Sequence, residues 1–305
     1  SRGHFVALPL KLTRSLQQAD ALATFYTSAW SPLCNRDGEL PLLRAVLQRL
    51  RQENIARLTL APLADDSPYL QNLARALRET GWRGVHSYFC FGNWRHHNRP
   101  GNFAEYEAGR PSRLRNTLAR RGRQFMAATA NSLELVTGPE QLESAIAEFV
   151  EVYNASWKRP EPYPKFIPGL IRLAAQQGWL RLGFARCDGK AIAAQLWIVH
   201  NNTAYIFKLA YDEHYRQLSP GTVLTGFMLR HVIEQDGVTG IDYLSGDDDY
   251  KRDWMSVRRE FNGLAAYNPG SLRGLAGLLG HWLKSLGKKL LFLPGLRRPA
   301  GNEVN

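Results

Sequence analysis

The segment from residue 204 to residue 254 constrains the fold more than any other, because it predicts a strand, a helix and a second strand in direct succession. Residues 204–211 alternate polar and apolar side chains, which is typical of a strand. A Ser-Pro-Gly turn at 219–221 favours the start of a helix that continues to residue 235. A short strand over 240–244 then leads to three consecutive aspartates. This order is typical of an α/β sheet whose polar residues gather at the strand ends.

The rest of the chain extends this α/β order in both directions. In the first half, the pattern predicts helix 40–53, strand 56–63, helix 67–80, strand 85–91, an irregular segment over 92–111 and an arginine-rich helix over 112–128. In the second half it predicts strand 133–136, helices 139–157 and 164–177, strands 179–187 and 191–199, a short helix from Asp249 and a last strand over 260–267. We therefore expect an α/β fold with a mixed sheet.

Composition limits the class of protein. The 305 residues, 44% of them hydrophobic, are enough for two domains. The three cysteines, Cys34, Cys90 and Cys187, stand apart, so neither a disulfide framework nor a thiolate zinc site is expected, and no other metal site is predicted. No apolar run approaches the roughly 20 residues that span a bilayer. We therefore expect a cytoplasmic protein.

The net charge of +12 comes almost entirely from two short segments. Residues 110–123 contain six arginines and no acidic residue, and residues 269–305 contain six basic residues and one acidic residue, Glu303. A protein groove for polynucleotides usually spreads basic residues over one continuous face. Local contacts with phosphates or with lipid headgroups explain this distribution equally well.

Three groups of residues in the second half carry a resemblance to a known family. They are Tyr211-Asp212, Ser219-Pro220-Gly221, and the run Asp242-Tyr243-Leu244-Ser245-Gly246-Asp247 with Tyr250-Lys251. This combination resembles the CelD/BcsL-type acetyltransferases of cellulose and exopolysaccharide loci, which are related to the FemAB aminoacyltransferases and their two GNAT-like halves. The resemblance is specific over residues 133–267.

The resemblance implies a tandem GNAT-like fold in three parts. Residues 1–128 would form a degenerate GNAT-like half, residues 129–268 the GNAT acyltransferase domain, and residues 269–305 a basic amphipathic tail. Acetyl-CoA or another acyl-CoA would be the donor, and a small molecule or glycan the acceptor. The oligomeric state is left open.

The turn over residues 216–222 is where the resemblance places the diphosphate of coenzyme A. Unpaired backbone N–H groups at the start of a helix favour an anion. Gly221 would allow a close approach, and Arg216 would add a positive charge. Ser219 and Thr222 complete the predicted donor site. GNAT domains usually have two small residues, two positions apart, at this turn, whereas only Gly221 is present here. An ordinary helix start capped by Ser219 is therefore the alternative.

The aspartate run and its neighbours contain the predicted catalytic groups. Asp247 or Asp249 could take the proton of an attacking amine or hydroxyl, and Tyr250 could protonate the departing thiolate. Lys251 and Lys208 could stabilise negative charge on the tetrahedral intermediate. Acidic residues ahead of a helix are also common caps, so a structural role for the aspartates is the alternative.

Four further residues are predicted to contact substrate. Asp242 lies inside a strand, where a carboxylate needs a partner, and Lys208 is the candidate for an ion pair. Simple alternation places Lys208 on the face opposite its aromatic neighbours. Tyr211, Arg113 and Arg120 complete the set, since the arginine-rich helix could hold an anionic substrate such as a nucleotide-sugar diphosphate or a tRNA acceptor end. A solvated basic face is the simpler interpretation of those arginines.

The tail predicts an amphipathic helix over residues 271–293. An apolar stripe repeats at Leu272, Leu275, Leu279, Trp282, Leu283, Leu286 and Leu290, with Arg273, Lys284 and Lys288 near the opposite face. Four glycines weaken a free helix by roughly 1 kcal/mol each relative to alanine. We therefore expect the stripe to pack on the protein body. Peripheral contact with the inner face of a membrane is the alternative.

These observations predict an acyltransferase that moves an acyl group from acyl-CoA to an amine or hydroxyl of a sugar or glycan precursor, in exopolysaccharide or envelope synthesis. A FemAB-like transferase that uses aminoacyl-tRNA is the second hypothesis, favoured by the basic segments and the single glycine. A non-catalytic module that binds glycan or nucleic acid is the third. Salt dependence separates them, because tRNA binding weakens steeply with salt.

Overall fold

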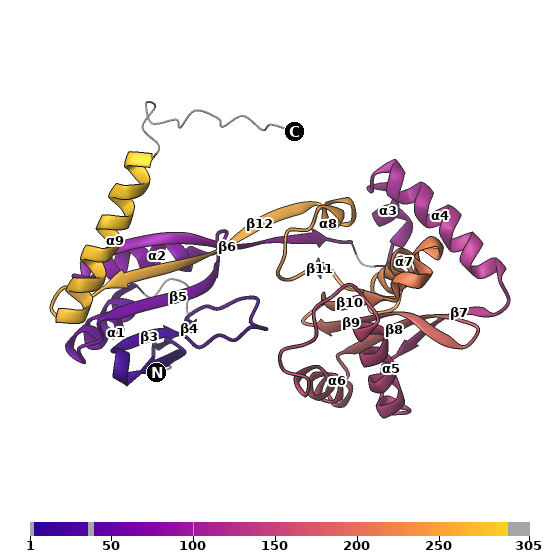
Figure 1. Cartoon of the computed structure of the whole chain (residues 1–305), viewed down its shortest axis with the longest axis horizontal. Helices are drawn as coiled ribbons and strands as arrows, with labels where there is room; N and C mark the ends of the chain where they lie inside the picture. Colours follow the sequence, from indigo (N-terminus) through magenta and orange to yellow (C-terminus); the bar gives the residue numbers. More distant parts are fainter. Residues whose placement is uncertain (1–2, 36–39, 100, 292–305) are drawn as a thin grey trace, which may run out of the picture. The chain divides into compact units, whose positions relative to one another are not determined.

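The computed structural model describes residues 3–35, 40–99 and 101–291. These residues belong to two compact units (Figure 1). Unit 1 consists of residues 1–91 and 259–305, and unit 2 consists of residues 92–258.

The boundaries of the units lie inside two strands. The chain leaves unit 1 within β6 (Arg83–His97) and returns to it within β12 (Val257–Tyr267). The units therefore differ from the three parts predicted from the sequence. Residues 92–128 fold with the second unit, and residues 259–268 and the tail helix fold with the first.

Unit 1 is a mixed sheet covered by helices. Its elements are β1 (Val6–Ala7), β2 (Leu10–Thr13), a 3-10 turn (Arg14–Leu16), β3 (Gln18–Ala21), β4 (Leu33–Cys34), α1 (Leu40–Gln52), β5 (Arg57–Ala64), α2 (Pro68–Glu79) and α9 (Leu272–Leu291). The strand order is β2-β3-β5-β12-β6, with β3 parallel and β12 antiparallel to β5. Leu47, Leu60, Leu73 and Trp82 are completely buried in its core. Ser67 caps α2 by accepting the N–H of Tyr69.

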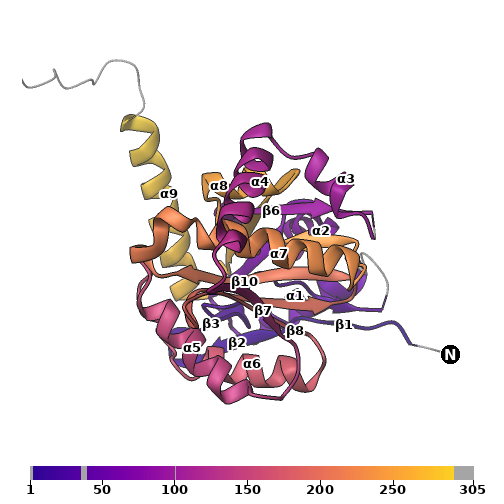
Figure 2. The same ribbon diagram turned by 90° about the vertical axis from the view of Figure 1, so that its right-hand side faces the viewer.

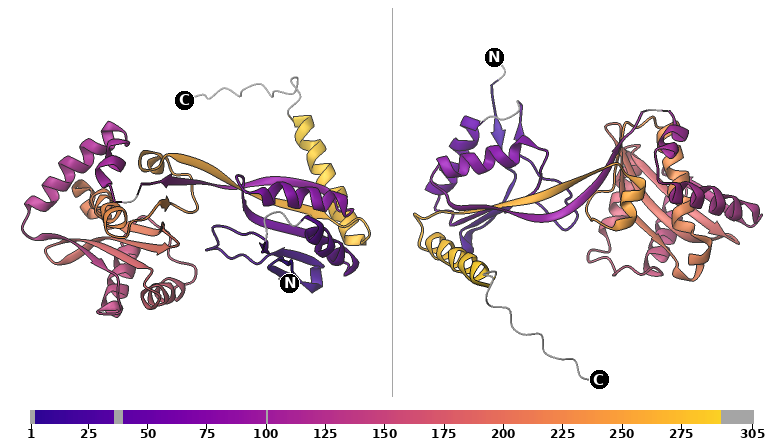
Figure 3. Two further views of the ribbon diagram at one scale, coloured as in Figure 1. Left: turned by 180° about the vertical axis from the view of Figure 1, so that it is seen from behind. Right: turned by 90° about the horizontal axis from the view of Figure 1, so that it is seen from above.

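Helix α9 packs on unit 1 (Figure 3), and the packed face carries Gly274, Gly277 and Leu278, not the predicted leucine stripe. A Cβ at Gly274 would lie 2.0 Å from the backbone oxygen of Asn268, and a Cβ at Gly277 would lie 2.8 Å from the Tyr267 ring. The expected helix is present, but the prediction that the protein body covers its leucine stripe is wrong. Leu272, for example, is 89% exposed. The side chains of Leu286, Lys288 and Leu290 lie outside the described part of the chain.

Unit 2 contains the longer, strongly periodic elements. They are α3 (Phe103–Ala108), α4 (Ser112–Ala127), β7 (Asn131–Val136), α5 (Leu142–Asn154), α6 (Phe166–Gln176), β8 (Leu180–Cys187), β9 (Lys190–His200), β10 (Thr203–Tyr211), a 3-10 segment (Glu213–Leu218), α7 (Pro220–Glu234), β11 (Gly240–Asp242) and α8 (Asp249–Trp254). The sheet order is β7-β8-β9-β10-β11-β6. Helices α4 and α7 cover one face, and α5 and α6 cover the other (Figure 2).

The predicted irregular segment over 92–111 is wrong in two places. Strand β6 continues to His97 because residues 95–97 pair with β11, and α3 forms over Phe103–Ala108 with Asn102 accepting the N–H of Glu105. Pairing with β11 therefore extends β6 beyond the residue at which the local sequence pattern predicts its end. None of the helices in the described part of the chain combines the length and hydrophobicity needed to cross a bilayer.

Strand β10 has two features that shape unit 2. It runs parallel to β11, but only residues 203–205 pair with residues 240–242, so the remainder of β10 pairs with β9 alone among the described strands. In addition, a β-bulge interrupts the β9 register between Ile206 and Lys208. Because cross-strand partners share a face, the bulge puts Lys208 on the same face as Tyr205. The alternation predicted for Lys208 is therefore wrong.

Candidate functional site

A cavity of about 400 Å³ lies in unit 2, beside the last residues of β10. It is lined by Arg113, Leu114, Thr117, Trp157, Gln195, Leu209, Tyr211, Gly221, Thr222, Thr225, Tyr250, Asp253 and Trp254. Five residues predicted from the sequence meet here, namely Arg113, Tyr211, Gly221, Thr222 and Tyr250. They come from α4, β10, α7 and α8, so the fold joins residues far apart in the sequence.

The start of α7 presents unpaired backbone donors to this cavity. Among the described residues, no acceptor bonds the backbone N–H of Gly221 or of Thr222. Ser219 has left-handed backbone angles (φ 53°), and its side chain makes no cap hydrogen bond. The expected alternative, a helix start capped by the Ser219 side chain, is therefore not what the structure contains. Two free amides at a helix start form a site suited to an anion.

A buried glutamine fixes the position of these donors. Gln195 is 1% exposed, and its side-chain amide donates to the backbone oxygen of Gly221 (3.1 Å) and to the hydroxyl of Thr225 (2.8 Å). Its carbonyl accepts the indole N–H of Trp197 at 2.9 Å. The first turn of α7 is thus tied to β9. Because Gly221 has no side chain, the ring of Tyr211 can lie beside it; a Cβ at this position would lie 3.2 Å from that ring.

Asp247 is held by cationic and indole donors. The guanidinium of Arg258 forms an ion pair with it at 2.6 Å, and the indole N–H of Trp94 donates to it at 2.7 Å. Arg258 holds the pKa of Asp247 below its usual range. A carboxylate with a lowered pKa is a weaker base. Asp249, the first residue of α8, is exposed.

Lys251 holds the loop that leads to α8. The residue is 5% exposed, and its ammonium donates to the backbone oxygens of Ser245 (3.1 Å) and Gly246 (3.2 Å) and pairs with Asp248 at 3.0 Å. A lysine has three N–H donors, and these partners use them. Gly246, with φ 110°, leaves space for the ammonium. Lys251 therefore positions the loop.

Tyr250 reaches the cavity from α8 with its phenol kept protonated. Its ring meets the ring of buried Tyr243 edge to face at 5.9 Å. Burial, and then the charge of Asp248, raise the pKa of Tyr250. A neutral phenol can donate a hydrogen bond or a proton to an anion beside it.

Lysine side chains gather on the α5 face, and one of them was not predicted. Lys208 is ion-paired with Glu161. The ammonium of Lys158 lies 5.8 Å from the centroid of the Tyr153 ring and 5.7 Å from that of the Trp157 ring, and Trp157 lines the cavity. Burial, and then the nearby charges of Lys208 and Lys251, lower the pKa of Lys158 to about 8. No local pattern marks Lys158, since its environment comes from three separate segments.

The remaining predicted residues occupy varied positions. The carboxylate of Asp242 is 7% exposed and accepts from the Asn93 side chain (2.6 Å) and from the Leu244 N–H (2.7 Å), two hydrogen bonds that offset the cost of its burial. Arg113 is paired with Asp253 at 2.5 Å. Arg216 and Arg120 are exposed and do not line the cavity.

The arginine-rich segment is not one basic surface. Arg110 is 8% exposed, and its guanidinium donates to the backbone oxygens of Tyr106 and Trp254 and to the hydroxyl of Ser256. It therefore holds α3 to the end of α8. No three or more His, Cys, Asp and Glu side chains in the described residues are grouped so that they could hold a metal ion.

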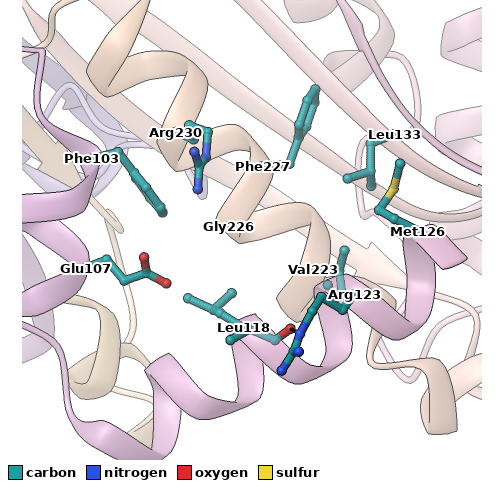
Figure 4. Close-up of a pocket in the computed structure, with 12 residues that line it drawn as sticks. Phe103, Glu107, Leu118, Arg123, Met126, Leu133, Val223, Gly226, Phe227 and Arg230 are labelled. Carbon is teal, nitrogen blue, oxygen red and sulfur yellow. Dashed lines mark hydrogen bonds between the residues drawn. The ribbon is translucent and has the colours of Figure 1, made fainter.

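A second cavity, of about 430 Å³, lies between α3, α4, α7 and β7 (Figure 4). Helix α4 crosses α7 closely here, since a Cβ at Gly226 would lie 2.7 Å from Leu118. The lining is mostly apolar, and the Arg230 guanidinium lies 4.6 Å from the centroid of the Phe103 ring. None of the site residues predicted from the sequence lines this cavity.

Residues 112–252 match the family described as acetyltransferase (GNAT) domain. Unit 2 has a GNAT fold. The predicted mixed α/β fold of GNAT type is thereby confirmed, with the open edge of β10 and the start of α7 inside the matched region. No curated protein matches the sequence.

Three solved structures resemble the chain over most of its length. The C-terminal domain (DUF2156) of a putative lysylphosphatidylglycerol synthetase from Agrobacterium fabrum has a TM-score of 0.54 at 14% identity, with 94% of this chain and 90% of that chain covered. L-PGS from Bacillus licheniformis has a TM-score of 0.53 at 12% identity, covering 86% and 82%. FemX has a TM-score of 0.55 at 11% identity, covering 81% and 83%. At these identities the likeness shows the fold alone.

Proposed function

We propose that this chain transfers an acyl group from acyl-CoA to an amine or hydroxyl of a sugar or glycan precursor. The observation that carries the proposal is the cavity in which the free amides of Gly221 and Thr222, the open edge of β10 and the phenol of Tyr250 meet. A thioester donor needs an anion site for its diphosphate, a path to the reacting carbon and a proton for its thiolate. In this proposal, the free amides would provide the anion site, the open edge of β10 the path, and Tyr250 the proton.

The donor would bind along the α7 face. Its diphosphate would accept hydrogen bonds from the two free amides, strengthened by the dipole of α7, with exposed Arg216 one turn earlier. Its amide-containing arm would lie beside the part of β10 that β11 leaves unpaired, where strand groups can bond a ligand. The thioester would then lie near Tyr250 and Trp157.

The acceptor would approach from the α5 face, where Lys158 and Lys208 lie. Neutral Lys158 would take the proton of the attacking amine or hydroxyl as the new bond to the acyl carbon forms. The C–S bond then breaks, and Tyr250 would donate its proton to the departing thiolate. Asp249 is the other candidate base, because Asp247 is ion-paired.

A FemAB-like transferase that uses aminoacyl-tRNA is the second candidate. The fold neighbours over most of the chain favour it, because they include FemX, L-PGS and the C-terminal domain of a putative lysylphosphatidylglycerol synthetase. The single glycine at the start of α7 and the basic residues of α4 favour it as well. Its acceptor would be an amine or a lipid hydroxyl.

Binding of donors to two variants at Thr222 tests these candidates. Thr222→Glu places a carboxylate beside the free amides, so we expect acetyl-CoA affinity, measured by calorimetry, to fall about tenfold or more. Thr222→Val keeps the shape and is the matched control. Gly221→Val is less informative, because its side chain also meets Tyr211.

If acetyl-CoA does not bind the native protein and tRNA binds with a steep salt dependence, the aminoacyl-tRNA-dependent transferase is the correct candidate and the acyl-CoA-dependent one is wrong. Binding of neither donor would favour a non-catalytic module.

A further inference from the structure

Helix α9 carries an apolar stripe that no described residue covers. Leu272, Leu275, Leu279, Trp282 and Leu283 are 89%, 43%, 50%, 55% and 70% exposed. Their spacing of three and four residues puts them on one face of the helix. An exposed apolar surface of this kind marks a site of interaction. We propose that this stripe lies on an anionic lipid bilayer, with α9 parallel to the membrane surface.

The opposite face of α9 is fixed to unit 1 by close contacts. Gly274 touches the backbone at Asn268, and Leu278 is 4% exposed. His281 stacks on His86 with ring centroids 4.0 Å apart. The spacing of Gly274, Leu278 and His281 is again helical, so the attached face and the exposed stripe lie on different sides. The helix is therefore held in place with its stripe outward, and membrane contact needs no unfolding.

The charges that α9 carries are complementary to anionic lipid. Arg273 and Lys284 are exposed on α9, and Arg57 lines the same surface depression as these two residues. The sequence contains no Asp or Glu from residue 261 to residue 302. An exposed apolar stripe on a helix whose polar side carries cations and no acid is typical of a helix that binds the interface of anionic membranes.

These same charges argue against a second copy of the chain as the occupant. Two stripes packed together would place two helices that each carry Arg273 and Lys284 side by side, with no acid on the helix to offset the repulsion between them. An anionic bilayer removes the same apolar surface from water and attracts those charges. Lipid is therefore the occupant that the charges of α9 favour.

Sedimentation of the whole chain with vesicles tests the proposal. We expect it to sediment with phosphatidylcholine vesicles that contain phosphatidylglycerol, and not with phosphatidylcholine alone. Leu279→Ser combined with Trp282→Ser should weaken this binding about tenfold or more, because two apolar side chains no longer leave water. Lys284→Gln should weaken it about fivefold. The matched control is Leu22→Ser with Phe25→Ser, two residues that are 60% and 68% exposed outside α9; it should bind as the native chain does.

Circular dichroism and the unfolding temperature should be unchanged in every variant, because all the altered side chains are exposed. The proposal is overturned if the native chain ignores anionic vesicles, or if the double stripe variant binds them as tightly as the control. It is equally overturned if light scattering finds a dimer that only the stripe variant dissociates, since a second copy would then cover the stripe.

Discussion

The pH dependence of transfer should follow the protonation of Lys158. Its pKa is lowered to about 8, first by burial and then by the charges of Lys208 and Lys251. About a tenth of the side chain is then neutral at pH 7 and about nine tenths at pH 9. If the neutral amine is the base, the rate should rise about tenfold over this interval, with a midpoint near pH 8. Lys158→Met should lower the rate about a hundredfold.

A change at Lys208 separates a catalytic base from a bystander. Lys208→Met removes a positive charge near Lys158 and removes the ammonium that pairs with the carboxylate of Glu161, and both changes favour the protonated form of Lys158. The midpoint of the rate profile should therefore move to higher pH. We would measure thiol release from acetyl-CoA with glucosamine as the acceptor, between about pH 6.5 and pH 9.5. The titration of glucosamine itself is common to all variants and cancels in the comparison.

Two results would refute the role of Lys158. One is full activity in Lys158→Met. The other is an active Lys208→Met variant whose midpoint is that of the native chain. Lys165→Met is the control, because Lys165 is an exposed lysine close by in sequence that does not line the cavity. Its rate and its midpoint should not change.

Two further predictions concern the proton donor and the attachment of α9. Tyr250→Phe should lower turnover about a hundredfold while donor affinity is retained, because the phenol acts only when the thiolate leaves. If the variant and the native chain turn over equally fast at saturating acetyl-CoA, Tyr250 is not the acid. Gly274→Ala should destabilise unit 1 by about 1–3 kcal/mol in urea unfolding, because its Cβ would lie 2.0 Å from the Asn268 oxygen. A Cβ at Gly280 would meet nothing within 4 Å, so Gly280→Ala should leave the free energy of unfolding unchanged or raise it. Equal effects of the two substitutions would contradict the packing of α9 on unit 1 at Gly274.

The elements that could be predicted from sequence are those with a strong local period. Helix α7, strand β10 and the helices α5 and α6 follow the predicted positions closely, because the period of their apolar residues is the same in the sequence and in the fold. Strand β6 was predicted to end at residue 91 and continues to His97. Its last residues are held by pairing with β11, which no window of the sequence contains.

The tail illustrates a different limit. Its leucine stripe and its glycines are both visible in the sequence, but the pattern does not say which face meets the body. A leucine face gains more from burial, and this led to the wrong expectation. Backbone at Asn268 and Ala56 lies so close to α9 that only a residue without a side chain fits at position 274. Close approach of backbones selected the glycine face.

Some properties of the candidate site could be predicted from the sequence, and others could not. Tyr211, Gly221, Thr222 and Tyr250 could be found from sequence, because each stands next to a strand end or a helix start, and the fold brings those ends together. The lowered pKa of Lys158 could not be predicted, since it comes from residues about 50 and 93 positions away along the chain, which only the folded sheet brings near.

The bulge in β10 places side chains of the proposed transferase site on both faces of one sheet. Without it, strict alternation would put Lys208 on the face of Ile206, and Leu209 and Tyr211 on the face of Tyr205. With it, Leu209 and Tyr211 face the cavity beside α7, while Lys208 faces Glu161 and the α5 side. The edge of β10 that β11 leaves open separates these two groups. In the proposed reaction, a donor on one face and an acceptor on the other would meet at this edge, beside the cavity that Tyr250 and Trp157 line.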